Sequence, residues 1–86
     1  MKTEANMTAK TIKAAVEKTY GAGALINGIN EVFDGRWCKA GRRYNSYRAI
    51  LHGLQGLTDC THVNLSVTDQ YGVGHDADFA MVEFAQ

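Results

Sequence analysis

The sequence predicts an α+β fold of about three short helices packed on a C-terminal antiparallel β-hairpin. Three observations carry this prediction. Apolar residues recur at helical spacing over roughly the first two thirds of the chain. They then alternate with polar residues after residue 61, as half-buried strands require. With 86 residues, the chain fits a single domain covering residues 1–86.

The first two expected helices come from apolar residues spaced three or four apart. Residues 8–20 place Ile12 and Val16 on one face, and Thr8 is suited to cap the N-terminus. Gly21 can adopt the left-handed conformation that ends a helix. A second helix is expected over residues 24–33, ended by the glycine after Asp34, with an apolar stripe of Leu25, Ile26, Ile29, Val32 and Phe33.

A third helix is expected after a basic segment. Residues 36–44 are expected to form a loop or a short strand. Asn45 or Ser46 can cap the helix that follows, which should end near Gly56. Its apolar side holds Tyr47, Ile50, Leu51 and Leu54.

The last 25 residues predict a β-hairpin. Val63, Leu65 and Val67 alternate with polar residues, and a second strand is expected over residues 77–84. The favoured register pairs Val67 with Ala77, Leu65 with Phe79 and Val63 with Met81, which leaves residues 69–75 as a loop. A slip of one residue would set Leu65 against Asp78, which a buried face would not accept.

This hairpin motivates a hypothesis about association. A lone two-stranded ribbon is marginally stable in water, and only residues 37–39 offer a further short strand. We therefore expect the sheet to be completed from outside the chain, either by dimerisation or by a partner protein that pairs with the hairpin edge.

The charges divide the chain into two halves of opposite sign. All nine Lys and Arg residues lie at or before Arg48, where they face only four acidic residues. The remaining five acidic residues follow in a segment that has no Lys or Arg, so the formal net charge is zero. Such an asymmetry bears on partner choice and encounter rate rather than on fold.

The basic segment is the main candidate for partner binding. Arg, Trp and Tyr are enriched at the energetic centres of protein interfaces, and this segment supplies Arg36, Trp37, Arg42, Arg43 and Tyr47. Guanidinium groups and aromatic rings also suit phosphates and unpaired bases, so nucleic-acid binding stays open, although a pI near 6.8 opposes it. The alternative without a ligand is a solvated loop in which Trp37 anchors the core.

The acidic candidates for partner binding are Asp69, Asp76 and Asp78. Their spacing matches no calcium loop, so basic residues of a partner are preferred over a metal ion. Cys60 and His62 would need both His75 and Cys38 to complete a zinc site, and the expected register separates His75 from His62. No nucleophile can be placed with an orienting His and acid, so no catalytic residue, metal or cofactor is expected.

Residues 29–65 resemble the C-terminal module of baseplate J-like phage tail proteins. The resemblance is carried by Phe33-Asp-Gly-Arg-Trp37, Gly41-Arg-Arg-Tyr44, Ser46 to Leu54, Gly56-Leu57 and Val63–Leu65. It implies a helix leading into a basic turn, then a Ser-initiated helix and a short strand. It also implies a structural role in a contractile tail baseplate, and it covers under half of the chain.

Together these observations favour a small non-enzymatic protein-binding module. Short charge-polarised chains of this size are common among phage and mobile-element accessory proteins, many of which inhibit a host complex, as anti-CRISPR proteins do. A baseplate component and a nucleic-acid-binding protein are the alternatives. The polar start at residues 1–5 and the lack of an apolar run near ~20 residues lead us to expect a cytoplasmic protein with no membrane partner.

Overall fold

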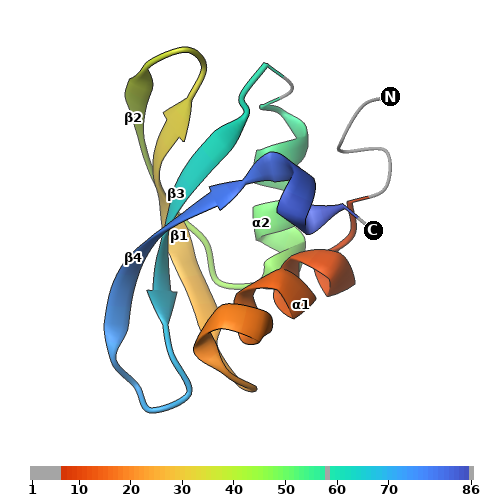
Figure 1. Cartoon of the computed structure of the whole chain (residues 1–86), viewed down its shortest axis with the longest axis vertical. Helices are drawn as coiled ribbons and strands as arrows, with labels where there is room; N and C mark the ends of the chain where they lie inside the picture. The colour runs from red at the N-terminus through yellow and green to blue at the C-terminus, as the bar shows by residue number, and fades with distance from the viewer. Residues whose placement is uncertain (1–6, 58, 86) are drawn as a thin grey trace.

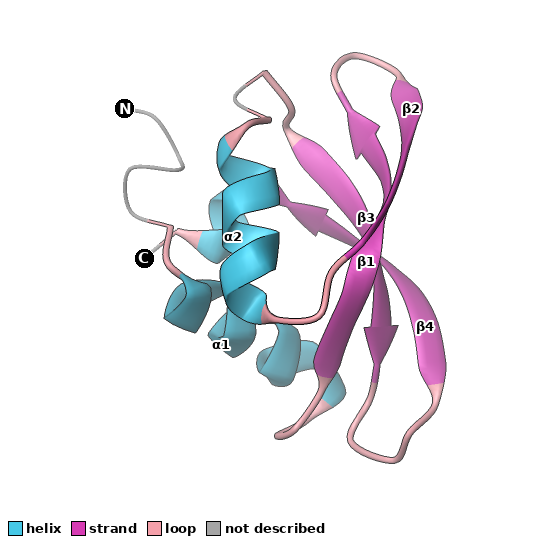
Figure 2. Cartoon of the chain, turned by 180° about the vertical axis from the view of Figure 1, so that it is seen from behind, coloured by secondary structure: helices cyan, strands magenta, loops and turns pink. Residues whose placement is uncertain are grey.

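The structure is a computed structural model that describes residues 7–57 and 59–85. These residues form two layers, in which both α-helices lie on one face of a four-stranded sheet (Figures 1 and 2). In chain order the elements are α1 (Ala9–Tyr20), β1 (Leu25–Phe33), β2 (Trp37–Arg43), α2 (Tyr47–Gln55), β3 (His62–Thr68), β4 (Gly74–Ala80) and the 3-10 helix η2 (Met81–Phe84).

The sheet is antiparallel throughout, with the strand order β2-β1-β3-β4. The core lies between this sheet and the helices. α1 contributes Ile12 and Val16, and α2 contributes Ile50 and Leu54, all of them fully buried. The sheet and η2 supply the facing side chains, which include Ile26, Ile29, Val32, Val63, Leu65, Val67, Phe79 and Phe84.

Both helices that flank β1 and β2 begin and end where the sequence predicts. Thr8 caps α1 by accepting a hydrogen bond from the Thr11 backbone N–H at 3.1 Å, and Gly21 follows the helix with a φ of 94°. Ser46 caps α2 in the same way through the Ala49 N–H at 3.2 Å, and Gly56 ends it. Local capping chemistry therefore determined these boundaries.

The helix expected over residues 24–33 is wrong, because this segment is the central strand β1. Its pairing with β3 carries irregularities between Ile26 and Gly28 and between Ile29 and Glu31. Each irregularity adds one residue to β1 relative to β3, which is a β-bulge. The buried residues Ile26, Ile29 and Val32 therefore recur every three positions instead of every two, and this spacing imitates a helix.

The fold class is α+β, but the expected arrangement of three helices on a C-terminal hairpin is wrong. The described chain has two α-helices and four strands, because residues 24–33 form β1 instead of a helix. The basic segment forms β2, which is the strand alternative that the sequence left open for residues 36–44. The second hairpin strand, expected over residues 77–84, is only partly a strand. It ends at Ala80, and Met81–Phe84 form the 3-10 helix η2.

The hairpin register is shifted by two residues from the expected one. Leu65 pairs with Ala77 and Val63 with Phe79, so the turn between β3 and β4 holds five residues, 69–73, rather than seven. A shift of two keeps every side chain on its own face of the sheet, so the alternating pattern was equally compatible with both registers. The turn itself decided between them.

The reason given for association is also wrong. β3 pairs with β1 on the side away from β4, so the terminal ribbon is already part of a four-stranded sheet within one chain. The sheet needs no second molecule to complete it. Among the residues that the structure describes, no helix is long and apolar enough to cross a membrane.

Gly28 offers a test of the close approach between β1 and β2. A Cβ at this position would overlap the Arg42 carbonyl oxygen and lie 3.1 Å from the Arg43 Cα, both of which belong to the backbone of β2. We expect Gly28→Ala to lower the free energy of unfolding by about 1–3 kcal/mol, because β2 must move away.

The measurement is urea unfolding followed by circular dichroism. The matched control is Gly74→Ala in β4, where a Cβ would meet nothing within 4 Å. We expect this control to change stability by less than about 0.5 kcal/mol. Equal stability of the two variants would contradict the close packing of β1 on β2.

Candidate functional site

The face of the sheet that the helices leave open is the candidate site. Strand pairing aligns its side chains into three rows that run across all four strands. The aromatic row consists of Trp37, Phe33, His62 and Ala80. The lysine row consists of Lys39, Glu31, Asn64 and Asp78, and the arginine row consists of Arg43, Gly28, Ser66 and Asp76.

The aromatic row forms an exposed cluster at the β1–β2 turn. The Phe33 ring meets the Trp37 ring edge to face at a centroid distance of 5.4 Å, and it meets the His62 ring at 6.0 Å. Trp37 remains 44% exposed, although it packs on Phe33. The reading of Trp37 as a core anchor in a loop therefore does not hold, because the residue lies on an open strand face.

Side-chain amides connect the middle of the other two rows. The Asn30 amide donates to Asn64 Oδ1 at 3.0 Å and to Asp76 Oδ1 at 3.2 Å. The Asn64 amide in turn donates to Asp78 Oδ1 at 2.6 Å. Asn30 is the extra residue of one β1 bulge, so the bulge supplies the donor that contacts Asp76 and Asn64, whereas Asp78 is contacted by Asn64.

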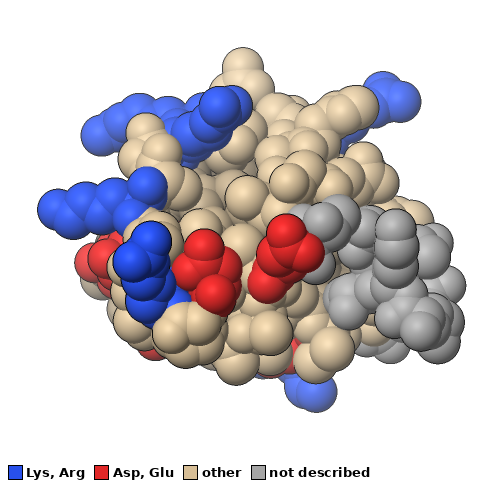
Figure 3. All heavy atoms as spheres, turned by 90° about the horizontal axis from the view of Figure 1, so that it is seen from above, with Lys and Arg blue, Asp and Glu red and all other residues tan. Residues whose placement is uncertain are grey.

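Charges of opposite sign share this region of the surface. β2 and its turn carry Arg36, Lys39 and Arg43, whereas β4 carries the exposed Asp76 and Asp78. In Figure 3 most of the visible Lys and Arg side chains lie on the left of the view, with acidic groups beside them. A mixed surface of this kind favours a partner with charges of both signs over a uniform polyanion.

The residues predicted for partner binding fall into separate places. Arg36, Trp37 and Arg43 lie at the turn or on the open face, as do Asp76 and Asp78. Arg42 pairs with the buried Ile29, so it belongs to the helix side, where it lines a groove with Tyr44 and His52.

Tyr47 and Asp69 have internal partners. The Tyr47 hydroxyl donates to the Ala24 carbonyl at 2.6 Å, and burial, followed by the nearby Glu17 carboxylate, raises the pKa of Tyr47 to about 12. Its side chain therefore ties α2 to the start of β1.

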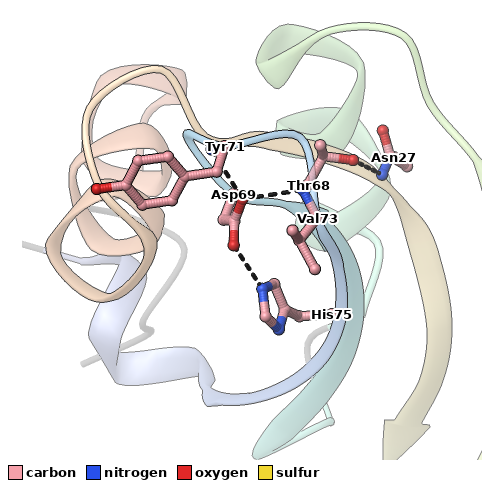
Figure 4. A network of polar contacts seen from close by, with 6 residues as sticks. All are labelled: Asn27, Thr68, Asp69, Tyr71, Val73 and His75. Carbon is pink, nitrogen blue, oxygen red and sulfur yellow. Dashed lines mark hydrogen bonds and ion pairs between the residues drawn. The ribbon is translucent and has the colours of Figure 1, made fainter.

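Asp69 organises the turn between β3 and β4 (Figure 4). Its Oδ1 accepts hydrogen bonds from the Tyr71 N–H at 2.8 Å and the Val73 N–H at 2.9 Å. Its Oδ2 lies 2.8 Å from His75 Nε2, and the His75 ring stacks at 5.0 Å from Tyr20 of α1. The hydrogen bond with His75, and then those with the backbone, lower the pKa of Asp69. This Asp–His pair holds a turn and docks it on α1.

The four residues considered for zinc do not form a site. His62 is on the open face, whereas Cys38 pairs with Val32 on the helix side, and His75 is bonded to Asp69 at the far turn. Burial, and then the nearby Asp34, raises the pKa of the Cys60 thiol, which makes it a poorer nucleophile. Within residues 7–57 and 59–85, no three His, Cys, Asp or Glu side chains are placed to hold a metal ion.

Sequence reasoning missed Phe33, His62, Asn30 and Asn64 as members of this surface. Phe33 falls in the apolar stripe that predicts a helix over residues 24–33, and no motif of the sequence singles out Asn30 or Asn64. A spacing of three residues combined with β-branched residues and a glycine was the available signal for a bulged strand.

The chain was compared with protein-family models, with curated proteins and with solved structures, and none of them matches it.

The Asp69 contacts predict a pH dependence of stability. A carboxyl whose pKa is lowered by folding stabilises the folded state above its unfolded pKa of about 3.9, and this contribution is lost as the pH falls through the folded value. We expect Asp69→Asn to lower the urea midpoint at pH 7 and to have a smaller effect at acidic pH, as the wild-type carboxyl becomes protonated.

The control for this measurement is Asp59→Asn, at an exposed position outside the turn. It should leave the midpoint close to that of the wild type at both pH values. A loss in Asp69→Asn that is the same at both pH values would instead show that the carboxylate charge is irrelevant to the turn.

Proposed function

We propose that this protein is a non-catalytic protein-binding module that contacts its partner through the aromatic row and the adjacent Arg36. The observation that carries the proposal is the exposed Trp37 ring, which is held by Phe33 on an open strand face instead of being buried in the core. Tryptophan and arginine are the residues that most often dominate binding energy at protein interfaces.

The partner would be a larger protein with an acidic or mixed surface. Arg36 lies in the β1–β2 turn directly before Trp37, and Lys39 is two residues further along β2 on the same face. An aromatic anchor in an apolar pocket with charges at its rim is a common arrangement for recognition. The size and charge polarity of the chain support a cytoplasmic phage or mobile-element accessory protein that inhibits a host complex.

The test compares the loss of an aromatic side chain with the loss of a charged side chain on the same strand, β2. We expect Trp37→Ala to weaken partner binding by about 2 kcal/mol, which is roughly 30-fold in Kd. Lys39→Ala should cost far less, because a rim charge contributes little to affinity. Wild type and variants serve as parallel baits in a host lysate, and the captured protein is then titrated by calorimetry.

The matched control is Tyr71→Ala, which removes an aromatic ring that is 81% exposed in the opposite turn. Binding should be unchanged in this variant, and circular dichroism should show that all the variants fold. Equal losses for Trp37→Ala and Lys39→Ala, or a larger loss for Tyr71→Ala, would reject the aromatic row as the contact surface.

A second candidate is single-stranded nucleic acid. An aromatic row on an open sheet face, flanked by Lys39 and Arg43, is the kind of surface on which unpaired bases stack. Against it, Asp76, Asp78 and Glu31 lie on the same face and would repel phosphates.

Fluorescence anisotropy with a labelled single-stranded oligonucleotide distinguishes the two candidates. Phosphate-driven binding must weaken steeply with salt, with a slope of about −0.7 per phosphate contacted. We expect no saturable binding at about 150 mM salt. Tight binding that Trp37→Ala abolishes would favour the nucleic-acid function instead.

A further inference from the structure

Two strand edges remain for pairing in this sheet. β2 and β4 are the outer strands, and no other described strand or bridge pairs with them beyond β1 and β3. An outer strand presents backbone N–H and C=O groups that can extend a ladder into another chain. Which strand can pair with such an edge depends on the side chains that flank it.

The two edges carry opposite charges at matching heights. The lysine row begins with Lys39 on β2 and ends with Asp78 on β4. The arginine row begins with Arg43 on β2 and ends with Asp76 on β4. Each polar row therefore has a base at one edge of the sheet and an acid at the other.

The bulges produce this match. Lys39 and Arg43 are four residues apart, whereas Asp76 and Asp78 are two apart. The register of β2 on β1 shifts by one residue between Lys39 and Arg42, next to Gly41 with a φ of 59°, and β1 carries its own extra residue at Asn30. After both shifts the two bases stand level with the two acids.

Strand direction agrees with pairing between copies. β2 is antiparallel to β1, β1 to β3, and β3 to β4, so β2 and β4 run in opposite directions. A second copy displaced sideways along the rows would place its β2 antiparallel to β4 of the first. Its helices would then lie on the same side of the extended sheet as those of the first copy.

We infer that the protein associates with itself head to tail, through antiparallel pairing of β2 of one copy with β4 of the next. Lys39 would lie opposite Asp78 and Arg43 opposite Asp76. Trp37 would lie beside Ala80, whose small side chain leaves the face of the ring open.

The carboxylates are already positioned for this contact. Asp76 and Asp78 accept the amide hydrogen bonds of Asn30 and Asn64 through Oδ1. A carboxylate has a second acceptor oxygen, so Oδ2 of each residue can meet the base of the next copy. The amide bonds also reduce the side-chain entropy that would otherwise be lost on pairing.

The same charges disfavour the two-fold alternatives. In the antiparallel register that aligns the charges, pairing of β2 with β2 would set Lys39 of one copy opposite Arg43 of the other, and pairing of β4 with β4 would set Asp76 opposite Asp78. Like charges directly opposite one another across a strand pair are destabilising. The expected contact is therefore heterologous, and repetition of it builds a ring or an open filament.

Charge reversal at each edge tests the inference. The first variant, Lys39→Glu with Arg43→Glu, has two acidic edges, and the second, Asp76→Lys with Asp78→Lys, has two basic edges. Neither should self-associate, whereas an equimolar mixture should, because each acidic edge then meets a basic one. Arg36 and Trp37 are intact in both variants, and self-association is measured on the purified protein alone, so this outcome and the result of the partner-binding test can be told apart.

The measurement is sedimentation velocity at low ionic strength over a range of concentrations. We expect the weight-average mass of the wild type to rise at least about twofold above the monomer mass of 9.4 kDa. It should fall again at about 0.5 M salt, because exposed ion pairs are screened. The control, Lys10→Glu with Lys13→Glu on α1, makes the same change in net charge as the first variant but away from the edges, and it should associate like the wild type.

Three results would overturn the inference. The wild type could remain monomeric at every concentration, a single-edge variant could associate as strongly as the wild type, or the mixture could stay monomeric. Circular dichroism confirms folding before each run. If either double variant is unfolded, the single changes Arg43→Glu and Asp76→Arg repeat the same comparison with less perturbation of the Asn64 contact.

Discussion

The arrangement of β1 is the constraint on which the rest of the structure depends. This strand pairs with β2 on one side and β3 on the other while it covers the inner faces of both helices. Its two extra residues relative to β3 keep Ile26, Ile29 and Val32 on the core side. Without these bulges, a strict period of two would turn one of the three toward water.

The bulges also shape the open face. The extra residues are asparagines, which can satisfy their amide groups across the sheet rather than within the ladder. The Asn27 amide donates to Thr68 Oγ1 at 2.8 Å, and Asn30 bonds to Asn64 and Asp76. The irregular backbone is thus fastened by side chains on the side away from the core. It presents an ordered polar surface next to the aromatic row.

The strand order determines where the charge asymmetry of the chain lies in the fold. The basic half of the sequence contains β2 and the acidic half contains β4, and β1 and β3 lie between them. The two charged segments are therefore held at opposite edges of one sheet, where they cannot neutralise each other directly. A neutral molecule with a basic edge and an acidic edge suits directional contacts better than bulk attraction.

The sequence by itself determined the capped helices, the α+β class, the alternation of β3 and the split of charge, because each depends on residues close together in the chain. Tertiary structure decided that residues 24–33 are a strand. Their three-residue apolar spacing by itself suits a helix, and only the hydrogen-bonded pairing with β3 makes this segment a bulged strand. It also decided the hairpin register, because Asp69 closes a shorter turn and the alternation permits a shift of two. The candidate surface followed the same division: Trp37 and the charged residues were visible in the sequence, whereas the rows that join them to Phe33, His62 and the asparagines arise only from pairing between distant strands.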